Sequence, residues 1–150
     1  MNRRHHIVLL AAAFLAACQP SADFTTSENE ALQWQQLQGR YVVVNYFAEW
    51  CAPCLKELPE LNRFYLQHQD QVSLFGVSYD NLDNAALAEL IAKYQIAFPL
   101  IRMQPAPQLP FAKPEALPAT YIITPQGEIK GPLMGEQSVE SLRQATQLTP

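Results

Sequence analysis

Hydrophobic and polar positions change their spacing along the chain, and the first changes predict a strand followed by a helix. Residues 41–47 (YVVVNYF) form a nearly continuous β-branched and aromatic run, which is typical of a strand buried on both faces. Over residues 52–68 the apolar residues recur at helical spacing and mark one stripe of a helix: Leu55, Leu58, Leu61 and Tyr65. Pro59 lies inside this predicted helix, where its ring and its missing N–H predict a kink.

The same order of elements repeats downstream. Residues 72–79 (VSLFGVSY) predict a second buried strand, and Asp83 predicts the N-cap of a helix that runs to about Tyr94. Residues 98–102 are a candidate short strand. A strand–helix–strand–helix order favours an α/β sheet with right-handed crossovers. The sequence therefore predicts an α/β fold in which helices flank a central sheet.

The last third of the chain begins with a segment that cannot form a regular element. Residues 103–118 contain five prolines, and we expect 103–116 to be a surface loop beside the functional site. Residues 120–124 and 128–131 then predict a β-hairpin, and Ser138 predicts the start of a final helix.

Composition limits the class of protein. The chain has 150 residues, which suits one compact domain, and its formal net charge is −4 with 16% charged residues. The chain has no excess of basic residues that would favour nucleic acid, so we expect no nucleic-acid partner.

The N-terminus has the pattern of an export signal. A basic stretch, MNRRHH, precedes eleven apolar residues, too few to span a bilayer but suited to the core of a signal peptide. The stretch Leu15-Ala16-Ala17-Cys18 resembles the bacterial lipoprotein box, which implies cleavage before Cys18 and lipidation of its sulfur. A plain secretory signal is the alternative. The predicted organisation is a signal peptide at 1–17, a lipidated tether at 18–38 and one folded domain at 39–150.

Export and lipidation would leave Cys51 and Cys54 as the only thiols of the mature chain. These thiols would lie outside the cytoplasm, where disulfides persist. We therefore expect a periplasmic protein that is attached to the membrane through Cys18. Gln19 follows the lipidated position, and under sorting of the enterobacterial type it favours the outer membrane.

Cys51 and Cys54 lie in the stretch EWCAPCLKE, where the predicted buried strand ends and the predicted helix begins. At this junction the unpaired N–H groups and the helix dipole stabilise the thiolate of Cys51, which is the nucleophilic form. Cys54 lies one turn into the helix and can attack a mixed disulfide formed at Cys51. Pro53 has no N–H and holds the turn. The spacing thus favours thiol–disulfide exchange.

Other uses of the two cysteines fit less well. A structural zinc site requires four ligands, whereas the processed chain offers two cysteines and His68. Haem attachment requires a histidine where the chain has Leu55, and a structural disulfide gains little chain entropy from so short a loop. A peroxidase lacks support because no Thr-x-x-Cys setting is present. We expect no metal and no cofactor; a dithiol metal-binding lipoprotein, such as a metallochaperone or an assembly factor, is the alternative.

Residues 45–54 (NYFAEWCAPC) resemble the thioredoxin superfamily, and specifically the extracytoplasmic TlpA/ResA-like thiol–disulfide oxidoreductases. The resemblance extends over about residues 39–147 and includes Pro59, the VSLFGVSYD strand, the YQIAFP segment and LPATYII. It implies a thioredoxin fold, with a central mixed β-sheet flanked by helices.

The resemblance also implies roles for residues around the cysteines. Pro118 matches the cis-proline that faces the dithiol, and it leaves the backbone of Leu117 free to pair with an extended substrate strand. Trp50 would form a wall of the site and, with Pro53, contact the substrate.

Two positions separate this chain from ordinary cytoplasmic thioredoxins, which carry a buried aspartate six residues before the first cysteine. Asn45 occupies that position here, and an amide cannot shuttle protons. Glu57 matches a glutamate that lies near the thiols in the ResA-like branch. A carboxyl group there would have a raised pKa and could relay a proton to or from Cys54. The alternative for Glu57 is a solvated helix residue.

The family resemblance favours a reductase of disulfides in exported proteins. A membrane electron donor of the DsbD/CcdA type would keep the dithiol reduced, and protein thiols and disulfides would be the substrates. A strong oxidant would carry the same residues, so the direction of electron flow rests on the resemblance alone.

Overall fold

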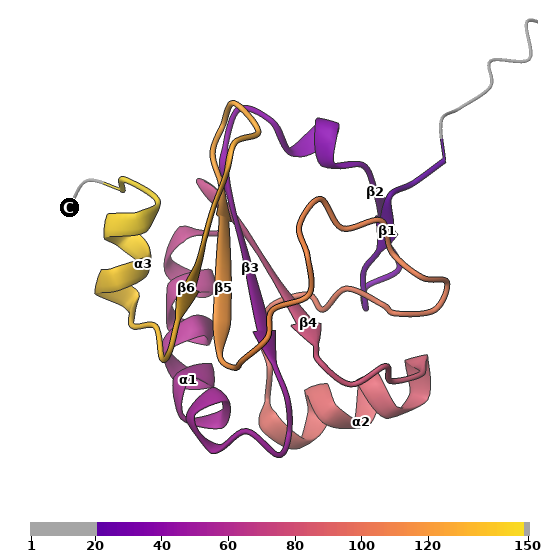
Figure 1. Cartoon of the computed structure of the whole chain (residues 1–150). Coiled ribbons are helices and arrows are strands. Elements are labelled where there is room, and N and C mark those ends of the chain that lie inside the picture. The colour runs from indigo at the N-terminus through magenta and orange to yellow at the C-terminus, as the bar shows by residue number, and fades with distance from the viewer. Residues whose placement is uncertain (1–20, 149–150) are drawn as a thin grey trace, which may run out of the picture.

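The computed structural model describes residues 21–148, and its centre is a four-stranded mixed β-sheet (Figure 1). The strands stand in the order β4-β3-β5-β6 and have these bounds: β3 Tyr41–Phe47, β4 Val72–Ser78, β5 Ala119–Ile123 and β6 Ile129–Met134. β3 is parallel to β4 and antiparallel to β5, and β6 is antiparallel to β5. The predicted central mixed sheet is confirmed.

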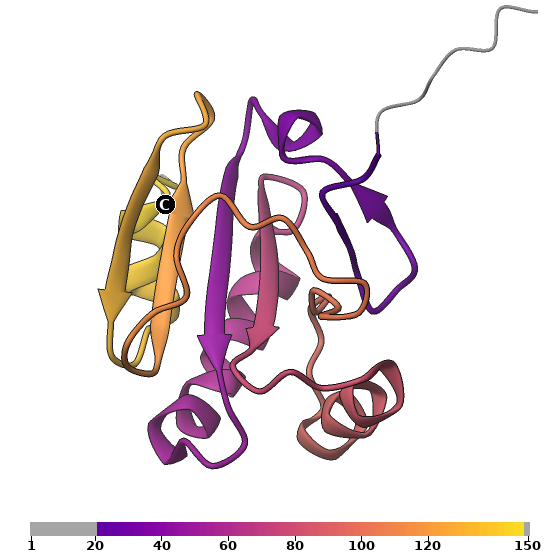
Figure 2. The same ribbon diagram turned by 45° about the vertical axis from the view of Figure 1, so that its right-hand side comes forward.

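Three α-helices accompany the sheet: α1 (Ala52–His68), α2 (Asn84–Tyr94) and α3 (Val139–Ala145). In Figures 1 and 2, α1 and α3 lie on one face of the sheet, and α2 lies beyond the end of β4. The predicted bounds of α1 are confirmed, and the side chains of Asp83 and Ser138 cap α2 and α3 as expected. Between residues 21 and 148 no helix combines the length and the apolarity needed to cross a bilayer.

β3 is buried on both faces because its alternate residues enter two hydrophobic cores. Val43 and Phe47 belong to the core between the sheet and the helices, which also contains Leu61 of α1. Val42 and Val44 belong to a second core on the opposite face of the sheet. The continuous apolar run of β3 therefore reflects burial on each face, as the sequence pattern predicted.

The first described residues cover the second core and are not the tether that the sequence predicted over 18–38. Short elements fill this stretch: β1 (Phe24–Thr25), β2 (Ala31–Leu32) and the 3-10 helix η1 (Trp34–Leu37). Phe24 is buried, and its ring centroid lies 4.5 Å from that of Trp34. Leu32, Trp34 and Leu37 pack against the second core, which confirms that they dock on the domain. The folded part thus begins before residue 39, and residues 18–20 lie outside the described part.

Residues 98–102 form two single bridges and not the strand that the sequence suggested. Leu100 bridges Gly76 of β4, and Ile101 bridges Thr26 on its other side. The Gly76 N–H donates to Pro99 O at 3.0 Å, and the Ile101 N–H donates to Gly76 O at 2.8 Å. Each neighbour thus pairs with the segment at a single residue.

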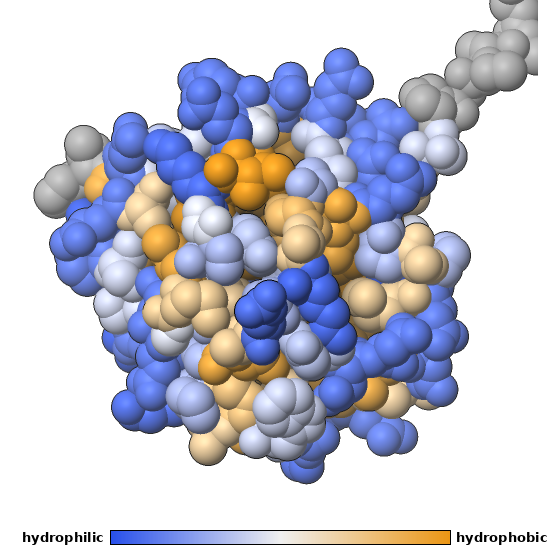
Figure 3. Space-filling view, in the orientation of Figure 1, coloured by the Kyte–Doolittle hydropathy of each residue, from blue (hydrophilic) through white to orange (hydrophobic). Residues whose placement is uncertain are grey.

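The proline-rich segment contains no helix or strand over residues 103–118, as predicted, and it packs on the second core. Phe111 stacks on Tyr121 of β5 with 4.3 Å between ring centroids. The Trp34 Nε1–H donates to Gln108 O at 2.7 Å. Figure 3 shows apolar patches among mainly hydrophilic residues on the face that carries this loop. The loop and the N-terminal hairpin together cover the face of the sheet that has no helix.

Candidate redox site

The dithiol lies where β3 ends and α1 begins. Cys51 is the N-cap residue of α1 with extended backbone dihedrals, and its sulfur accepts the Cys54 N–H at 3.3 Å. Pro53 lies in the first turn of the helix and is exposed, and its missing N–H removes one unpaired donor there. Cys51 and Cys54 form a disulfide, so the predicted pair is close enough for exchange.

The two sulfurs differ in accessibility in the predicted direction. The exposed fraction of Cys51 is 6%, whereas that of Cys54 is 0%. In the reduced protein, the N–H groups of the first helical turn would stabilise a thiolate at Cys51. An accessible attacking thiol and an enclosed resolving thiol are what thiol–disulfide exchange requires.

Pro118 occupies the neighbouring end of β5. The Leu117–Pro118 peptide bond is cis, as the resemblance implied. Ala119 follows and pairs with Tyr46 near the end of β3, so Pro118 lies beside the strand end that leads to Cys51. The Pro118 carbonyl accepts the Gly135 N–H at 2.9 Å. Leu117 is half-buried and packs against both cores.

Trp50 forms an exposed rim beside the dithiol. Its exposed fraction is 65%, and its Nε1–H donates to the Asp80 carboxylate, 3.0 Å from Oδ2. The Tyr79 ring meets the indole edge-on at 6.0 Å between centroids. Lys113 of the proline-rich loop lies 3.6 Å from the Tyr79 ring centroid and donates to Tyr79 O at 2.8 Å. The loop therefore reaches the rim of the site, as expected.

Sequence reasoning missed Tyr79, Asp80 and Lys113, because nothing in their spacing links them to Trp50.

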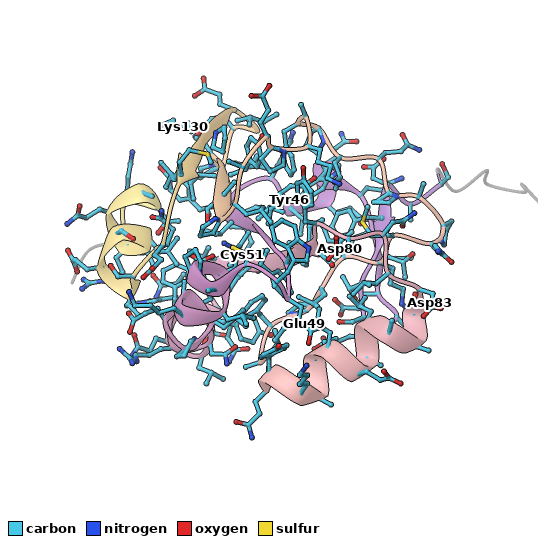
Figure 4. All side chains as sticks on the ribbon, turned by 60° about the horizontal axis from the view of Figure 1, so that its bottom comes forward. Tyr46, Glu49, Cys51, Asp80, Asp83 and Lys130 are labelled. Atoms are coloured by element: carbon cyan, nitrogen blue, oxygen red, sulfur yellow. A yellow bond between two sulfur atoms is a disulfide. The ribbon has the colours of Figure 1, made fainter. Side chains whose placement is uncertain are left out.

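Figure 4 shows Cys51 at the start of α1, with Glu49 and Asp80 between Cys51 and α2 in that view. Glu49 forms an ion pair with Lys93 of α2, and this hydrogen bond lowers the pKa of the Glu49 carboxyl. The rim is thus connected to α2 by a charged pair.

Glu57 is buried, with an exposed fraction of 1%, so the solvated alternative for this residue is wrong. Its Oε1 accepts the Asn45 Nδ2–H at 2.8 Å, and its Oε2 accepts the Gln137 backbone N–H at 2.8 Å. Burial raises the pKa of Glu57 to about 7, and the nearby Glu136 carboxylate adds to this rise. The hydrogen bonds from Gln137 and Asn45 act in the opposite direction.

Cys54 and Glu57 both belong to the buried face of α1 and stand three residues apart. Residues at this spacing have Cβ atoms about 5–6 Å apart on a helix. A carboxyl group with a pKa near neutrality therefore lies one turn from the resolving cysteine. The contact between Asn45 and Glu57 was not predicted, because it joins β3 to α1.

The described residues do not support the zinc alternative that combined the dithiol with His68. His68 is the last residue of α1, 14 positions after Cys54 and therefore about 20 Å away along the helix axis. Among residues 21–148, no group of three or more His, Cys, Asp or Glu side chains could hold a metal ion. Cys18, the predicted lipidation site, lies outside the described residues.

The family model described as AhpC/TSA matches residues 16–131, most of the chain. The chain belongs to the AhpC/TSA family. It is similar to the thiol–disulfide oxidoreductase ResA of Oceanobacillus iheyensis, with 28% identity over 116 residues. That alignment covers 77% of this chain and 60% of the relative, so the chain spans about three-fifths of the relative's length.

Solved structures agree on the fold. StoA from Bacillus subtilis superposes with a TM-score of 0.65 at 24% identity, covering 82% of this chain and 93% of StoA. A thiol:disulfide interchange protein of the thioredoxin family from Chlorobium tepidum gives a TM-score of 0.67 at 18% identity, covering 89% and 98%. The predicted thioredoxin fold and the resemblance to ResA-like thiol–disulfide oxidoreductases are thereby confirmed.

Proposed function

We propose that this ResA-like protein reduces disulfides of exported proteins. The observation that carries the proposal is the Cys51–Cys54 pair at the N-terminus of α1, with Cys51 the more accessible sulfur. The similarity to proteins named thiol–disulfide oxidoreductases supports the same chemistry. Substrates are protein disulfides and their thiol products, and the reaction uses no bound cofactor.

The reaction proceeds in two exchanges. The Cys51 thiolate attacks one sulfur of the substrate disulfide, which releases the other sulfur as a thiolate and forms a mixed disulfide. Cys54 then loses its proton and attacks Cys51 Sγ, which releases the second substrate sulfur. The substrate gains two electrons and, after protonation, becomes a dithiol, while the protein is left with the Cys51–Cys54 disulfide.

Glu57 is the group that receives the Cys54 proton in the second exchange and returns one when the disulfide is reduced again. Its burial, its position one turn from Cys54 and its pKa of about 7 support this role, because a base works best near the ambient pH. The substrate backbone pairs with Leu117 beside Pro118. Trp50 and Pro53, both exposed, contact the substrate from the other side of Cys51.

The N-terminal signal supports the proposed location, and the family resemblance supports the proposed electron donor. Cys18 carries the lipid that anchors the protein to the membrane, with the domain in the periplasm; Gln19 favours the outer membrane under enterobacterial-type sorting. A membrane donor of the DsbD/CcdA type supplies two electrons per cycle.

Insulin reduction by dithiothreitol tests the activity. The wild-type protein should accelerate precipitation of the insulin B chain, and Cys51→Ser should abolish the acceleration because the attacking sulfur is lost. Cys54→Ala should instead accumulate mixed disulfides through Cys51, visible as adducts on non-reducing gels. Stoichiometric copper or zinc binding without turnover would replace the proposal by the metal-binding alternative.

Alkylation of the two thiols in intact cells tests the direction. A reductase that is kept reduced should have Cys51 and Cys54 mostly alkylated at steady state, giving a mass shift on gels. Deletion of the membrane donor should convert the pair to the unreactive disulfide. A pair that is mostly oxidised in wild-type cells would instead identify an oxidant.

A further inference from the structure

A buried amide of β3 has one satisfied and one unsatisfied end. Asn45 is fully buried, and its Nδ2 donates both to Glu57 Oε1 at 2.8 Å and to Thr120 Oγ1 at 3.0 Å. Its Oδ1 is also buried, but no described residue donates a hydrogen bond to it. Buried polar atoms without a partner are uncommon and call for a physical reason.

The hydrogen bonds in place suit only one protonation state of Glu57. An ionised carboxylate accepts hydrogen bonds, whereas a carboxylic acid must also donate one. Oε2 faces the Gln137 N–H, which is a donor and cannot accept a hydrogen bond from a protonated Oε2. A proton on Oε1 would likewise point at the Asn45 Nδ2–H, another donor. Neutral Glu57 thus has no acceptor among its present partners.

We propose that Asn45 is a positioning residue whose side-chain amide turns by about 180° when Glu57 gains or loses its proton. With Glu57 ionised, Nδ2–H donates to Oε1, as in the present structure. With Glu57 protonated, Oδ1 takes the place of Nδ2 and accepts the Glu57 O–H. The inference rests on the proposed role of Glu57 as the proton acceptor.

Thr120 allows this reversal because a hydroxyl both donates and accepts. In the present orientation its Oγ1 accepts from Nδ2, and in the turned orientation its O–H donates to Oδ1. Each orientation leaves one end of the amide unpaired at the same buried place. The unpaired Oδ1 is then explained, because the Asn45 amide has to pair with Glu57 in both its ionised and its protonated form.

The side chains that surround Glu57 from the sheet are uncharged. β3 and β5 contribute the uncharged Asn45 and Thr120. The charged neighbours are Lys56 and Glu60, which flank Glu57 on α1, and Glu136, which pairs with Lys56 at 2.8 Å. When the disulfide is reduced, Cys51 and Cys54 add two titratable thiols. In the resolving step the proton moves from Cys54 Sγ to a Glu57 oxygen without electron transfer, and Asn45 holds the carboxyl in one place before and after.

Side-chain NMR of the oxidised protein tests the proposal without any activity measurement, because the disulfide removes the thiols from the titration. From about pH 5 to pH 9 the Asn45 amide signals should shift with the same midpoint as the Glu57 carboxyl carbon. Nuclear Overhauser effects from the Asn45 amide protons to Thr120 should be strong at high pH and lost at low pH. Asn45 signals that stay constant while Glu57 titrates would overturn the proposal, whether or not the protein reduces insulin.

Two variants sharpen the test. Glu57→Gln presents a permanent N–H donor toward Asn45, so the amide should adopt the turned orientation at every pH. Asn45→Ala should raise the midpoint of the Glu57 titration, because the charge-assisted bond to the ionised form is the stronger one lost. Thr146→Val removes a buried hydroxyl of the α3 C-terminus that does not contact Glu57, and it should leave both titrations unchanged. An unturned amide in Glu57→Gln would contradict the mechanism even if Asn45→Ala fails to fold.

Discussion

Glu57 makes the stability of the oxidised protein depend on pH at the level of one residue. Burial raises the pKa of its carboxyl from 4.5 to about 7 in the folded protein. Between these values the folded state binds more protons than the unfolded state, so the free energy of unfolding falls as pH rises. The shift corresponds to a loss of about 3 kcal/mol, complete once pH exceeds the folded pKa.

Denaturant unfolding of wild-type and Glu57→Gln proteins, both oxidised, measures this effect. Glutamine is neutral at every pH and still accepts the Gln137 N–H. The free energy of unfolding of the variant, relative to that of wild type, should therefore rise by about 3 kcal/mol from pH 4.5 to pH 8. Glu89→Gln, an exposed change on α2, is the matched control and should follow wild type. Parallel pH curves for wild type and Glu57→Gln would contradict the assignment.

The sequence predicted individual site residues where one element alone determines their positions. The spacing of Cys51 and Cys54 places one sulfur at the cap and the other in the first turn. Glu57 was inferred from family resemblance, and its burial follows from a position one turn beyond Cys54 on α1. The Gln137 N–H comes from 80 residues away, and no local pattern could assign it to Glu57.

At the scale of elements, the N-terminal hairpin is part of the folded domain. Phe24 is 3% exposed and contacts Trp34 and Phe75, with ring centroids 4.5 and 5.3 Å away. Phe24→Ala should therefore lower the free energy of unfolding by about 3–5 kcal/mol, measured by thermal or urea denaturation. Glu30→Ala, exposed on the same hairpin, should change it little. Equal stability of the two variants would restore the tether interpretation.

Gly76 shows why the connection after α2 packs so closely on β4. A Cβ at this position would overlap Leu100 Cδ2 and approach Phe98 Cε2 to 2.9 Å. Gly76→Ala should therefore destabilise the protein by about 1–3 kcal/mol, although alanine normally suits a strand better than glycine. Ser73→Ala on the same strand provides the comparison in denaturant titrations. A neutral or stabilising Gly76→Ala would mean that the 98–102 segment can move away from β4.

Long, periodic elements were predictable from the sequence, and short ones were not. α1 and the caps at Asp83 and Ser138 follow from spacing and local hydrogen bonding. The two-residue strands β1 and β2 are too short to show a period. Distant contacts hold them, such as the bond from Arg102 N–H to Thr25 O at 2.9 Å.

At the scale of the whole molecule, the shorter tether limits where the dithiol can work. If Cys18 carries the lipid, the chain from Cys18 to Phe24 reaches at most about 20 Å. Figures 1 and 2 show the described chain beginning away from the end of the sheet where α1 starts. The anchor would hold the domain close to the membrane surface.

Cys18→Ser tests this arrangement because serine has no sulfur to which the proposed lipid could be attached. The wild-type protein should sediment with membranes, and the variant should appear in the soluble periplasmic fraction. Insulin reduction should stay within about twofold of wild type, since residues 24–148 contain both thiols and their partners. Ser21→Ala keeps Cys18 and should remain with the membranes. Sedimentation of Cys18→Ser with membranes would show that another part of the protein makes the attachment, and loss of its activity would show that the anchor supports the fold.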